Sequence, residues 1–189
     1  MNYTDPKTAA AQAHEVLHFW LEEVPAAQRF VRDDALDVTI RERFGALRDR
    51  LLDSRAEAFR EDPKTLLGAI VALDQFSRNM FRGSPDAFAA DPLARELARL
   101  ALDRGWDRGM SVTERQFLYL PFMHSEDVAD QALCVKLCRE LGEPNTLAFA
   151  EKHAAQIERF GRFPQRNEAL GRATTPEEAA FLEQPDARF

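Results

Sequence analysis

The sequence predicts an all-α protein of about eight helices in antiparallel hairpins. Apolar residues recur every three or four positions, most clearly at Leu36, Ile40, Phe44, Leu47 and Leu51, which places them on one helical face. Capping side chains repeatedly stand directly before a proline or open a capping box, and both patterns mark helix starts. No long segment alternates apolar and polar residues as a half-buried strand would.

The starts of the expected helices carry the strongest local signals. Proline is tolerated at the first helical position because its missing N–H would have no partner there. The signals lie at Asp5-Pro6, Asp62-Pro63, Asp91-Pro92 and Thr175-Pro176, in the capping boxes Ser111–Glu114 and Thr175–Glu178, and at the further caps Asp33, Ser125 and Asn145. The expected helices span residues 6–22, 34–53, 63–80, 92–104, 112–122, 126–140, 146–160 and 176–183.

The helix ends are marked by residues that interrupt helical hydrogen bonding. Gly142 and Gly161 are expected to adopt the left-handed conformation just past two helices. Pro121 cannot donate to the carbonyl of Phe117, so its helix is expected to kink or end there. The connections are mostly short and no linker interrupts them, so we predict one domain over residues 1–189 with a core over about 6–184.

Composition and charge exclude several classes of protein. The 189 residues carry a net charge of −7, which argues against a nucleic-acid binder because phosphate contacts need a basic surface. No apolar run is long enough to cross a membrane, and the N-terminus lacks a secretory signal, so we expect a cytoplasmic protein without a membrane partner. We interpret Cys134 and Cys138 as two small buried hydrophobes on one helix. Two cysteines that form no disulfide fit a reducing compartment.

His14 and His18 are the nearest approach to a metal pair, because they lie one helical turn apart with Glu15 and Glu22 nearby. We interpret them as surface histidines on an amphipathic helix. The sequence also lacks a second cysteine pair that would complete a zinc site. We therefore predict neither a metal nor a cofactor.

Three segments combine arginine, histidine, amides and aromatics in a way that a plain helical scaffold does not. In the first segment, residues 73–83, Asp74, Arg78 and Arg82 are spaced at four and share one helical face, with Asn79 in the neighbouring row. The segment continues a strongly apolar helix, so its polar end is expected at the rim or base of the core. The two aligned guanidiniums either bind an anion, with Asp74 orienting Arg78, or form an internal ion pair.

The second segment contains Arg115 and Tyr119 one turn apart, followed by His124 at a helix junction. His124 is the best titratable candidate because its ordinary pKa lies near neutrality, and Glu126 is close enough in sequence to orient it. We expect His124 to point toward one of the other two segments and to touch a polar side chain there. The alternative is a junction histidine that is bound to a backbone carbonyl.

The third segment, residues 153–167, is basic within an acidic chain. Its arginines, with one just beyond it, are Arg159, Arg162, Arg166 and Arg172. A planar guanidinium can bind two oxygens of a carboxylate or phosphate at once. His153 lies on the same expected helix as a second candidate base. The segment forms either part of an anion site or a set of ion pairs between the C-terminal helices.

Five stretches stand out together along the chain: VLHFWLEE, DQFSRNMFRG, ERQFLYLPFMHSE, HAAQIERFGRFPQRN and TPEEAAFLEQ. This combination resembles the bacterial family called domain of unknown function 924, over roughly residues 15–185. One departure is Gln165, where the family often has histidine, and it weakens any scheme that needs a histidine there. The resemblance implies a tetratricopeptide-like superhelical fold and no particular activity, and a fold alone does not choose a function.

The leading hypothesis is a pocket lined by arginine and histidine that binds a small anionic molecule or an acidic group of a peptide. In this pocket arginines neutralise the ligand, Tyr119 and Asn79 orient it, and Asp74 or Glu126 fixes a neighbouring cation. The predicted ligand-binding residues are Asp74, Arg78, Asn79, Arg82, Arg115, Tyr119, Glu126, Arg159, Arg162 and Arg166.

Two alternatives belong to other classes of protein. A hydrolase or transferase would act on a phosphate or carboxylate ester, with His124 or His153 as the catalytic general base and arginines stabilising negative charge. A structural or protein-interaction module would use the arginine segments as internal ion-pair networks, such as Arg78 with Asp74. The sequence indicates no particular oligomeric state.

Overall fold

Every regular element of the described chain is helical, which confirms the predicted all-α class. The computed structural model describes residues 5–185 and residue 187, and no strand occurs among these residues. The chain forms two compact units. The N-terminal unit comprises Met1–Arg82 and Asp86–Pro121, and the C-terminal unit comprises Gly83–Pro85 and Phe122–Phe189. The single domain expected from the sequence stays a prediction.

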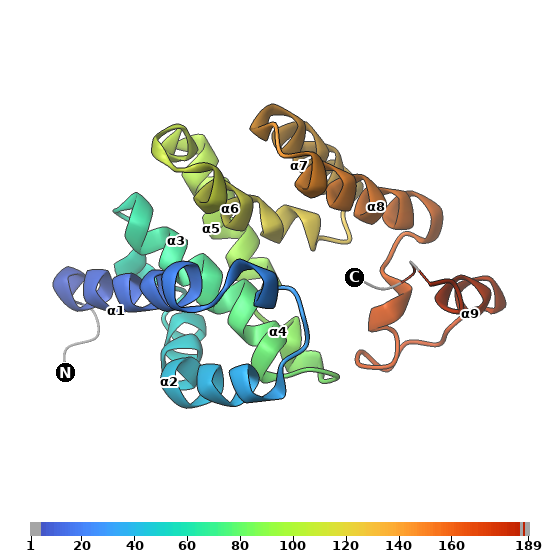
Figure 1. Ribbon diagram of the computed structural model, residues 1–189, viewed down its shortest axis with the longest axis horizontal. Helices are drawn as coiled ribbons and strands as arrows, with labels where there is room; N and C mark the ends of the chain where they lie inside the picture. Colours follow the sequence, from blue (N-terminus) through green and yellow to red (C-terminus); the bar gives the residue numbers. More distant parts are fainter. Residues whose placement is uncertain (1–4, 186, 188–189) are drawn as a thin grey trace. The chain divides into compact units, whose positions relative to one another are not determined.

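The N-terminal unit is assembled from helices that pack in pairs. In Figure 1, α1 lies beside α3, while α2 packs against α4 and the turn that precedes it. The last helix of the unit continues past Pro121 into the C-terminal unit. The helices are α1 (Pro6–His18), α2 (Asp34–Asp53), α3 (Pro63–Val71), α4 (Ser77–Met80), α5 (Asp91–Asp103) and α6 (Val112–Met123).

Several helix starts have the caps that the sequence predicts. The carboxylate of Asp5 accepts a hydrogen bond from the amide of Thr8 at 3.1 Å, and that of Asp62 accepts one from Thr65 at 2.8 Å. Each bond satisfies an amide that the helix itself leaves without an acceptor. The other predicted caps present are Asp33, Ser111 and Thr175.

Two expected helices are divided by π-helical turns, at Phe19–Glu23 and Ala72–Phe76. The continuous helices expected over 6–22 and 63–80 are therefore wrong in this detail. A π-helical turn holds one extra residue, which changes the direction of the side chains that follow. All five residues of the second turn are buried, Asp74 included, so this part of the first polar segment lies inside the unit.

Aromatic side chains form the centre of the N-terminal unit. The rings of Trp20 and Phe76 meet edge to face at 5.3 Å between centroids, and Phe44 lies 4.9 Å from Phe76. Each of these side chains is at most 1% exposed. Rings of this kind bury about 150–250 Å² apiece. The cluster therefore anchors the π-helical turn that carries Asp74 and leads into α4.

The contact between α1 and α3 is closest at Gly68. A Cβ atom at this position would lie 2.6 Å from the Cβ of Ala13 and 2.9 Å from its carbonyl oxygen. Because real Cβ atoms do not approach so closely, a side chain here would push the two helices apart. The glycine therefore sets the distance between the two helices.

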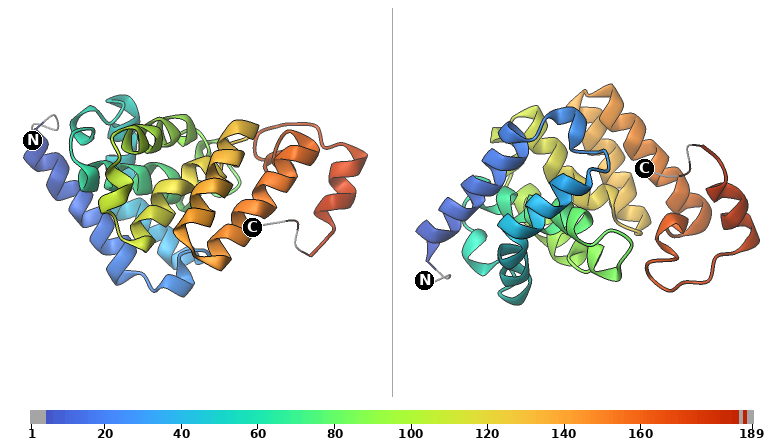
Figure 2. Two further views of the ribbon diagram at one scale, coloured as in Figure 1. Left: turned by 90° about the horizontal axis from the view of Figure 1, so that it is seen from above. Right: turned by 60° about the horizontal axis from the view of Figure 1, so that its bottom comes forward.

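The C-terminal unit contains a helical hairpin followed by a shorter helix. Gly142 and Gly161 follow the two hairpin helices with φ values of +79° and +69°, which confirms the predicted left-handed stops. The hairpin helices lie side by side in Figures 1 and 2, and their short connection makes them antiparallel. The helices of this unit are α7 (Val128–Leu141), α8 (Pro144–Phe160) and α9 (Pro176–Leu182).

Two predicted caps, Asp91 and Asn145, are wrong because neither residue occupies the capping position of its helix. Asp91 is the first residue of α5, and its carboxylate binds the guanidinium of Arg78 instead of capping the helix. Asn145 lies inside α8, which already begins at Pro144. A distant guanidinium competes for a carboxylate in a way that a local motif cannot show.

A third cap is displaced at the junction between α6 and α7. The carboxylate of Asp127, rather than Ser125, accepts the hydrogen bonds of the first amides of α7. The Ser125 hydroxyl donates to Asp130 at 2.8 Å and accepts from the amide of Asp127 at 3.2 Å. Pro121 lies inside α6, which ends two residues later at Met123. The junction is therefore shorter than the sequence indicated, and His124 lies directly after the helix.

Candidate functional site

The first polar segment forms a buried arginine–carboxylate network in the N-terminal unit. Arg78 spans both carboxylate oxygens of Asp91 at 2.8 and 2.9 Å, and it also donates to Asp74 Oδ1 at 3.0 Å. Gln75 donates to the other oxygen of Asp74 at 2.6 Å, and the Asp74 side chain is 1% exposed. Burial disfavours the charge of Arg78, but Asp74 and Asp91 outweigh burial and raise the pKa of the guanidinium.

A second network lies one turn further along the same face. Arg82 binds both carboxylate oxygens of Asp37, with 3.0 Å between Arg82 Nη2 and Asp37 Oδ1. The amide of Asn79 donates to Asp37 Oδ1 at 2.7 Å. Asp37 comes from α2, so this contact joins α2 to the helix of the first segment. Asp74, Arg78, Asn79 and Arg82 are thus all bound to groups of their own unit.

Arg115 and Tyr119 also lie in the N-terminal unit, on α6. The Tyr119 hydroxyl donates to Asp107 at 3.2 Å. Burial and the negative charge of Asp107 raise the pKa of Tyr119 to about 12, and Arg115 offsets only part of this effect. Tyr119 therefore stays protonated at neutral pH. The Nε of Arg115 is buried without a hydrogen-bond partner among the described residues.

His124 and His153 meet in the C-terminal unit, where α6 ends and α8 passes. Their ring centroids are 6.1 Å apart, and His153 contacts the Phe163 ring edge to face at 5.5 Å. The Nδ1 of His153 lies 2.7 Å from the carbonyl oxygen of Phe149, one turn earlier on α8. This carbonyl holds the proton on Nδ1 and fixes the orientation of the ring. The ring of His124 thus contacts His153 of the third segment, as the sequence predicts.

Arg166 completes this cluster. Its guanidinium lies 4.5 Å from the centroid of the Phe163 ring and donates to the carbonyl oxygen of His124 at 2.9 Å. A guanidinium over an aromatic face gains cation–π attraction, and the backbone bond fixes its direction. The side chains of His153 and Arg166 therefore both contact Phe163, and the ring of His124 lies beside His153. We call Arg166, His124, His153 and Phe163 the His–Arg cluster.

Glu126 has a role that the sequence did not indicate. Its carboxylate accepts both ends of the Arg172 guanidinium at 2.8 and 3.0 Å, and the amide of Phe163 at 2.8 Å. Burial works against its charge, but these partners outweigh burial and lower the pKa of Glu126. Glu126 thus holds the backbone beside the His–Arg cluster. Orientation of the His124 ring by Glu126 stays a prediction.

The remaining arginines of the third segment pair with α9. Arg162 spans both carboxylate oxygens of Glu178 at 2.6 and 2.9 Å, while Arg159 reaches the exposed Glu177 at 2.9 Å. The hydrogen bond from Arg162 and the amide of Thr175 lower the pKa of Glu178 to about 2. Glu178 is therefore both the third residue of a capping box and an ion-pair partner, and the sequence shows only the first role.

The predicted site residues thus fall into two groups. Asp74, Arg78, Asn79, Arg82, Arg115 and Tyr119 belong to the N-terminal unit, and His124, Glu126, His153, Arg159, Arg162 and Arg166 belong to the C-terminal unit. A single pocket that contains all of them stays a prediction. The partners that sequence reasoning missed are Asp37, Asp91, Asp107, Arg172 and Glu178 as an ion-pair residue.

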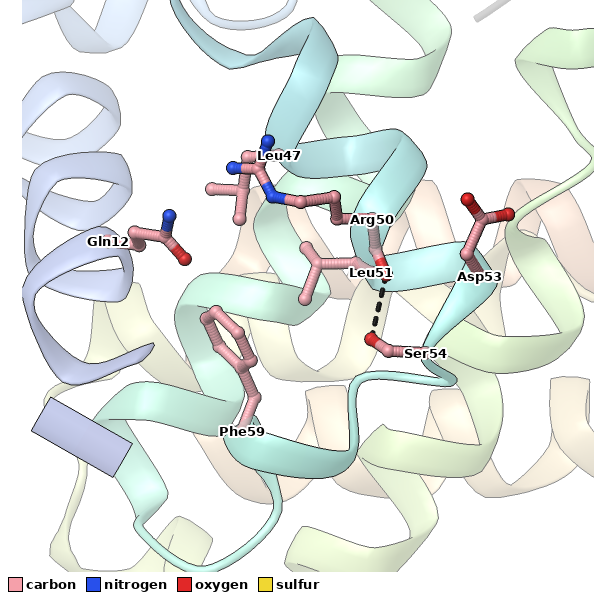
Figure 3. Close-up of a pocket in the computed structure, with 7 residues that line it drawn as sticks. All are labelled: Gln12, Leu47, Arg50, Leu51, Asp53, Ser54 and Phe59. Atoms are coloured by element: carbon pink, nitrogen blue, oxygen red, sulfur yellow. Dashed lines mark hydrogen bonds between the residues drawn. The ribbon is translucent and has the colours of Figure 1, made fainter. Parts of the chain in front are cut away.

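A pocket of about 180 Å³ lies elsewhere in the N-terminal unit, between α1 and the end of α2 (Figure 3). Leu47, Leu51 and Phe59 form its apolar part, and Gln12, Arg50, Asp53 and Ser54 stand around it. The Ser54 hydroxyl donates to the carbonyl of Arg50 at 2.7 Å. None of the predicted site residues lines this pocket, so it does not support the predicted anion site.

The two cysteines behave as the sequence predicts. Cys134 and Cys138 are free and fully buried on α7, with 3.8 Å between their sulfur atoms. The hydrogen bond that Cys134 donates to Cys138, together with burial, raises the pKa of Cys134, which keeps this thiol protonated. Over the described residues, no cluster of three or more histidine, cysteine or acidic side chains is arranged to hold a metal ion.

The fold and these contacts define an all-helical protein in which carboxylates of the chain bind most of the predicted ligand-binding arginines. The chain belongs to a bacterial protein family of unknown function, DUF924, whose family model matches residues 16–186. The family expected from the sequence is therefore confirmed. In the part of the chain that the structure describes, no helix has the length and apolar character needed to cross a membrane.

The chain is also similar to a solved structure. A protein of unknown function from Agrobacterium tumefaciens matches 93% of this chain and 98% of its own, with 40% sequence identity and a TM-score of 0.88. A comparison with curated proteins finds no match. These similarities establish the family and the fold, and the chemistry of the site has to be argued from its residues.

Proposed function

We propose that the protein binds a small anionic molecule, or an acidic group of a peptide, at the His–Arg cluster of the C-terminal unit. The observation that carries this proposal is that His153 contacts both His124 and Phe163, while Arg166 lies over Phe163 and binds the backbone of His124. A guanidinium can bind two oxygens of a phosphate or carboxylate, and an imidazole N–H can bind a third. The proposed site therefore offers a guanidinium and two imidazoles to the oxygens of one anion.

The surroundings of the cluster support this role. Phe163 and the carbonyl of His124 fix the guanidinium of Arg166, which reduces the entropy that binding would cost. The carboxylate of Glu126 is matched by the bidentate bond from Arg172. The cluster is therefore built on a rigid frame, although it lies partly outside regular helices.

A titration of the protein with inorganic phosphate tests the proposal. Calorimetry is expected to show saturable binding to the wild type. Loss of one charge-assisted hydrogen bond is worth about 1.5–3 kcal/mol, so Arg166→Gln should weaken binding by about 10- to 100-fold. Arg159→Gln is the matched control, since it removes the same charge from an exposed pair with Glu177 in the same unit.

Two results contradict this proposal. One is wild-type protein that binds neither phosphate nor a dicarboxylate. The other is equal weakening by Arg166→Gln and Arg159→Gln, which would show a general effect of net charge rather than a site.

A second candidate function, a structural or protein-interaction module, is favoured by the ion pairs of the other arginines. Arg78, Arg82 and Arg162 each bind a carboxylate with both ends of the guanidinium. We propose that these residues stabilise the fold and that the ligand site does not include them. A specific loss of anion binding in a well-folded Arg82→Gln variant would contradict this division.

An enzymatic role is the third candidate, and the bond of His153 to the Phe149 carbonyl is the observation that favours it. With the proton held on Nδ1, the Nε2 of His153 carries the lone pair that a general base requires. A screen of phosphate and acyl esters tests this role with wild type, His153→Ala and His124→Ala. Turnover that both histidine variants retain would assign the chemistry elsewhere, and turnover that either variant loses would support it.

We further propose a tetratricopeptide-like superhelical order of the helical hairpins and a cytoplasmic location. The antiparallel hairpin of α7 and α8 supports the first proposal, and the two free, buried cysteines support the second, because a reducing compartment keeps thiols free. An experimental structure of the full chain would show whether successive hairpins stack with a constant rotation. Fractionation of cells that produce the protein would test the location.

A further inference from the structure

Two histidines on α1 form a feature that the proposed anion site does not use. His14 and His18 lie one turn apart, and their rings are nearly parallel, with 6.1 Å between centroids and 7° between planes. The five residues from His14 to His18 read His-Glu-Val-Leu-His. Zinc metalloproteases present two metal ligands and a general base with this order and spacing on a helix. Both histidines are exposed, so solvent and ions can reach them.

The ring of His18 is oriented by a carboxylate. Its Nδ1 lies 3.0 Å from Oε2 of Glu22, one turn further along the chain. A carboxylate that accepts the Nδ1 proton leaves Nε2 as an electron-pair donor and increases its basicity, as in the carboxylate–histidine–metal arrangement. The Nε2 itself lies 3.6 Å from Oε1 of Glu23. One nitrogen of His18 is therefore available for a cation, with a second carboxylate beside it.

The local charge favours a cation. Glu15, Glu22 and Glu23 stand around the histidine pair, and Arg43 is the cation that faces them, 3.6 Å from Glu15 and 2.9 Å from Glu23. Three carboxylates against one guanidinium leave the surroundings negative while the imidazoles are neutral. Neutral imidazole is the form that binds metal ions.

We propose that His14 and His18 bind a divalent transition-metal ion of the Zn²⁺ class, with Glu22 positioning the ring of His18. Imidazole nitrogens suit zinc, copper and nickel, whereas Mg²⁺ and Ca²⁺ prefer oxygen ligands. Water completes the coordination, because the described residues supply no third protein ligand in a formed cluster. The proposal is a binding site and not a protease site, since Glu15, which would be the general base, lies beside the guanidinium of Arg43.

Calorimetric titration with Zn²⁺ at about pH 7.5 tests this site. Wild type should bind one ion in a saturable manner. The double variant His14→Gln/His18→Gln should lose the binding. Glu22→Gln should weaken it by about tenfold or more, as loss of a carboxylate partner to a metal-bound histidine typically does.

Glu140→Gln is the matched control for Glu22→Gln, because it removes an exposed carboxylate from another i,i+4 pair and should leave zinc binding unchanged. A thermal unfolding curve for each variant shows that it is folded, as expected for substitutions at exposed positions. Three outcomes would overturn the proposal: no saturable binding to wild type, binding that survives in His14→Gln/His18→Gln, or equal binding of Mg²⁺ and Zn²⁺.

Discussion

Arg78 and Arg82 offer a direct comparison of a buried and a partly exposed ion pair on one helical face. Both guanidiniums bind an aspartate with two hydrogen bonds, and they are four residues apart. They differ in access to water: the Arg78 side chain is 19% exposed and its partner Asp74 is 1% exposed, whereas Arg82 is 36% exposed and its partner Asp37 is 11% exposed. Arg78→Met would leave the buried Asp74 carboxylate without this guanidinium.

Breaking a buried pair by removing one partner costs about 3–5 kcal/mol, while an exposed pair contributes about 1 kcal/mol or less. A chain of this length loses about 2–4 °C of Tm per kcal/mol, so Arg78→Met should lower Tm by about 6–20 °C. Arg82→Met should lower Tm by less than Arg78→Met, because water screens the partly exposed Arg82 guanidinium and Asp37 keeps the hydrogen bond from Asn79.

Urea and thermal unfolding of the two variants measure this difference. In an Asp74→Asn background, Arg78→Met should cost less than in wild type, because the uncompensated charge is already gone. The coupling free energy between the two substitutions should be about 1–3 kcal/mol. Equal losses for Arg78→Met and Arg82→Met, or no coupling with Asp74→Asn, would refute the reasoning.

Three further predictions concern packing, pH and cooperativity. Gly68→Ala should destabilise the protein by about 1–3 kcal/mol through its clash with Ala13, whereas Gly45→Ala, whose Cβ would lie 3.8 Å from the nearest atom, should be neutral or stabilising by up to about 1 kcal/mol in chemical denaturation. The pKa of Glu178 is lowered to about 2, so its stabilising contribution is complete above its ordinary value near 4.5 and is lost as the pH falls toward 2. The difference in Tm between wild type and Glu178→Gln should therefore shrink between about pH 6 and pH 3, and a difference that stays constant would contradict this. Calorimetry should show one unfolding transition if the chain is a single domain, and two separate transitions would contradict that prediction.

The sequence predicts the helices well because their start signals are local. Asp5, Asp62 and Thr175 each cap an amide within three residues, so a short stretch of chain contains both partners. The sequence could not show that Asp91 fails to cap α5, because Arg78, thirteen residues earlier, binds its carboxylate. When a side chain can bind either its own helix or a residue distant in sequence, the sequence alone does not show which of the two bonds forms.

The same limit explains what the sequence shows of the candidate site. It identifies the segments rich in arginine, but the carboxylates that bind Arg162 and Arg82 come from other helices, α9 and α2. The π-helical turn that buries Asp74 is equally hidden, because an ordinary helical periodicity places this residue at the rim. The meeting of His124 with the third segment was predictable, since the junction after α6 is short and leaves its side chain little freedom.

The most direct test of the anion site is to follow the ring signals of His124 and His153 by NMR during a phosphate titration. Both signals should shift in a saturable manner with one common dissociation constant in the wild type. In a folded Arg166→Gln variant the same shifts should appear only at concentrations at least about tenfold higher. Ring signals that do not move, or that move identically in wild type and Arg166→Gln, would contradict the assignment of this cluster as the anion site.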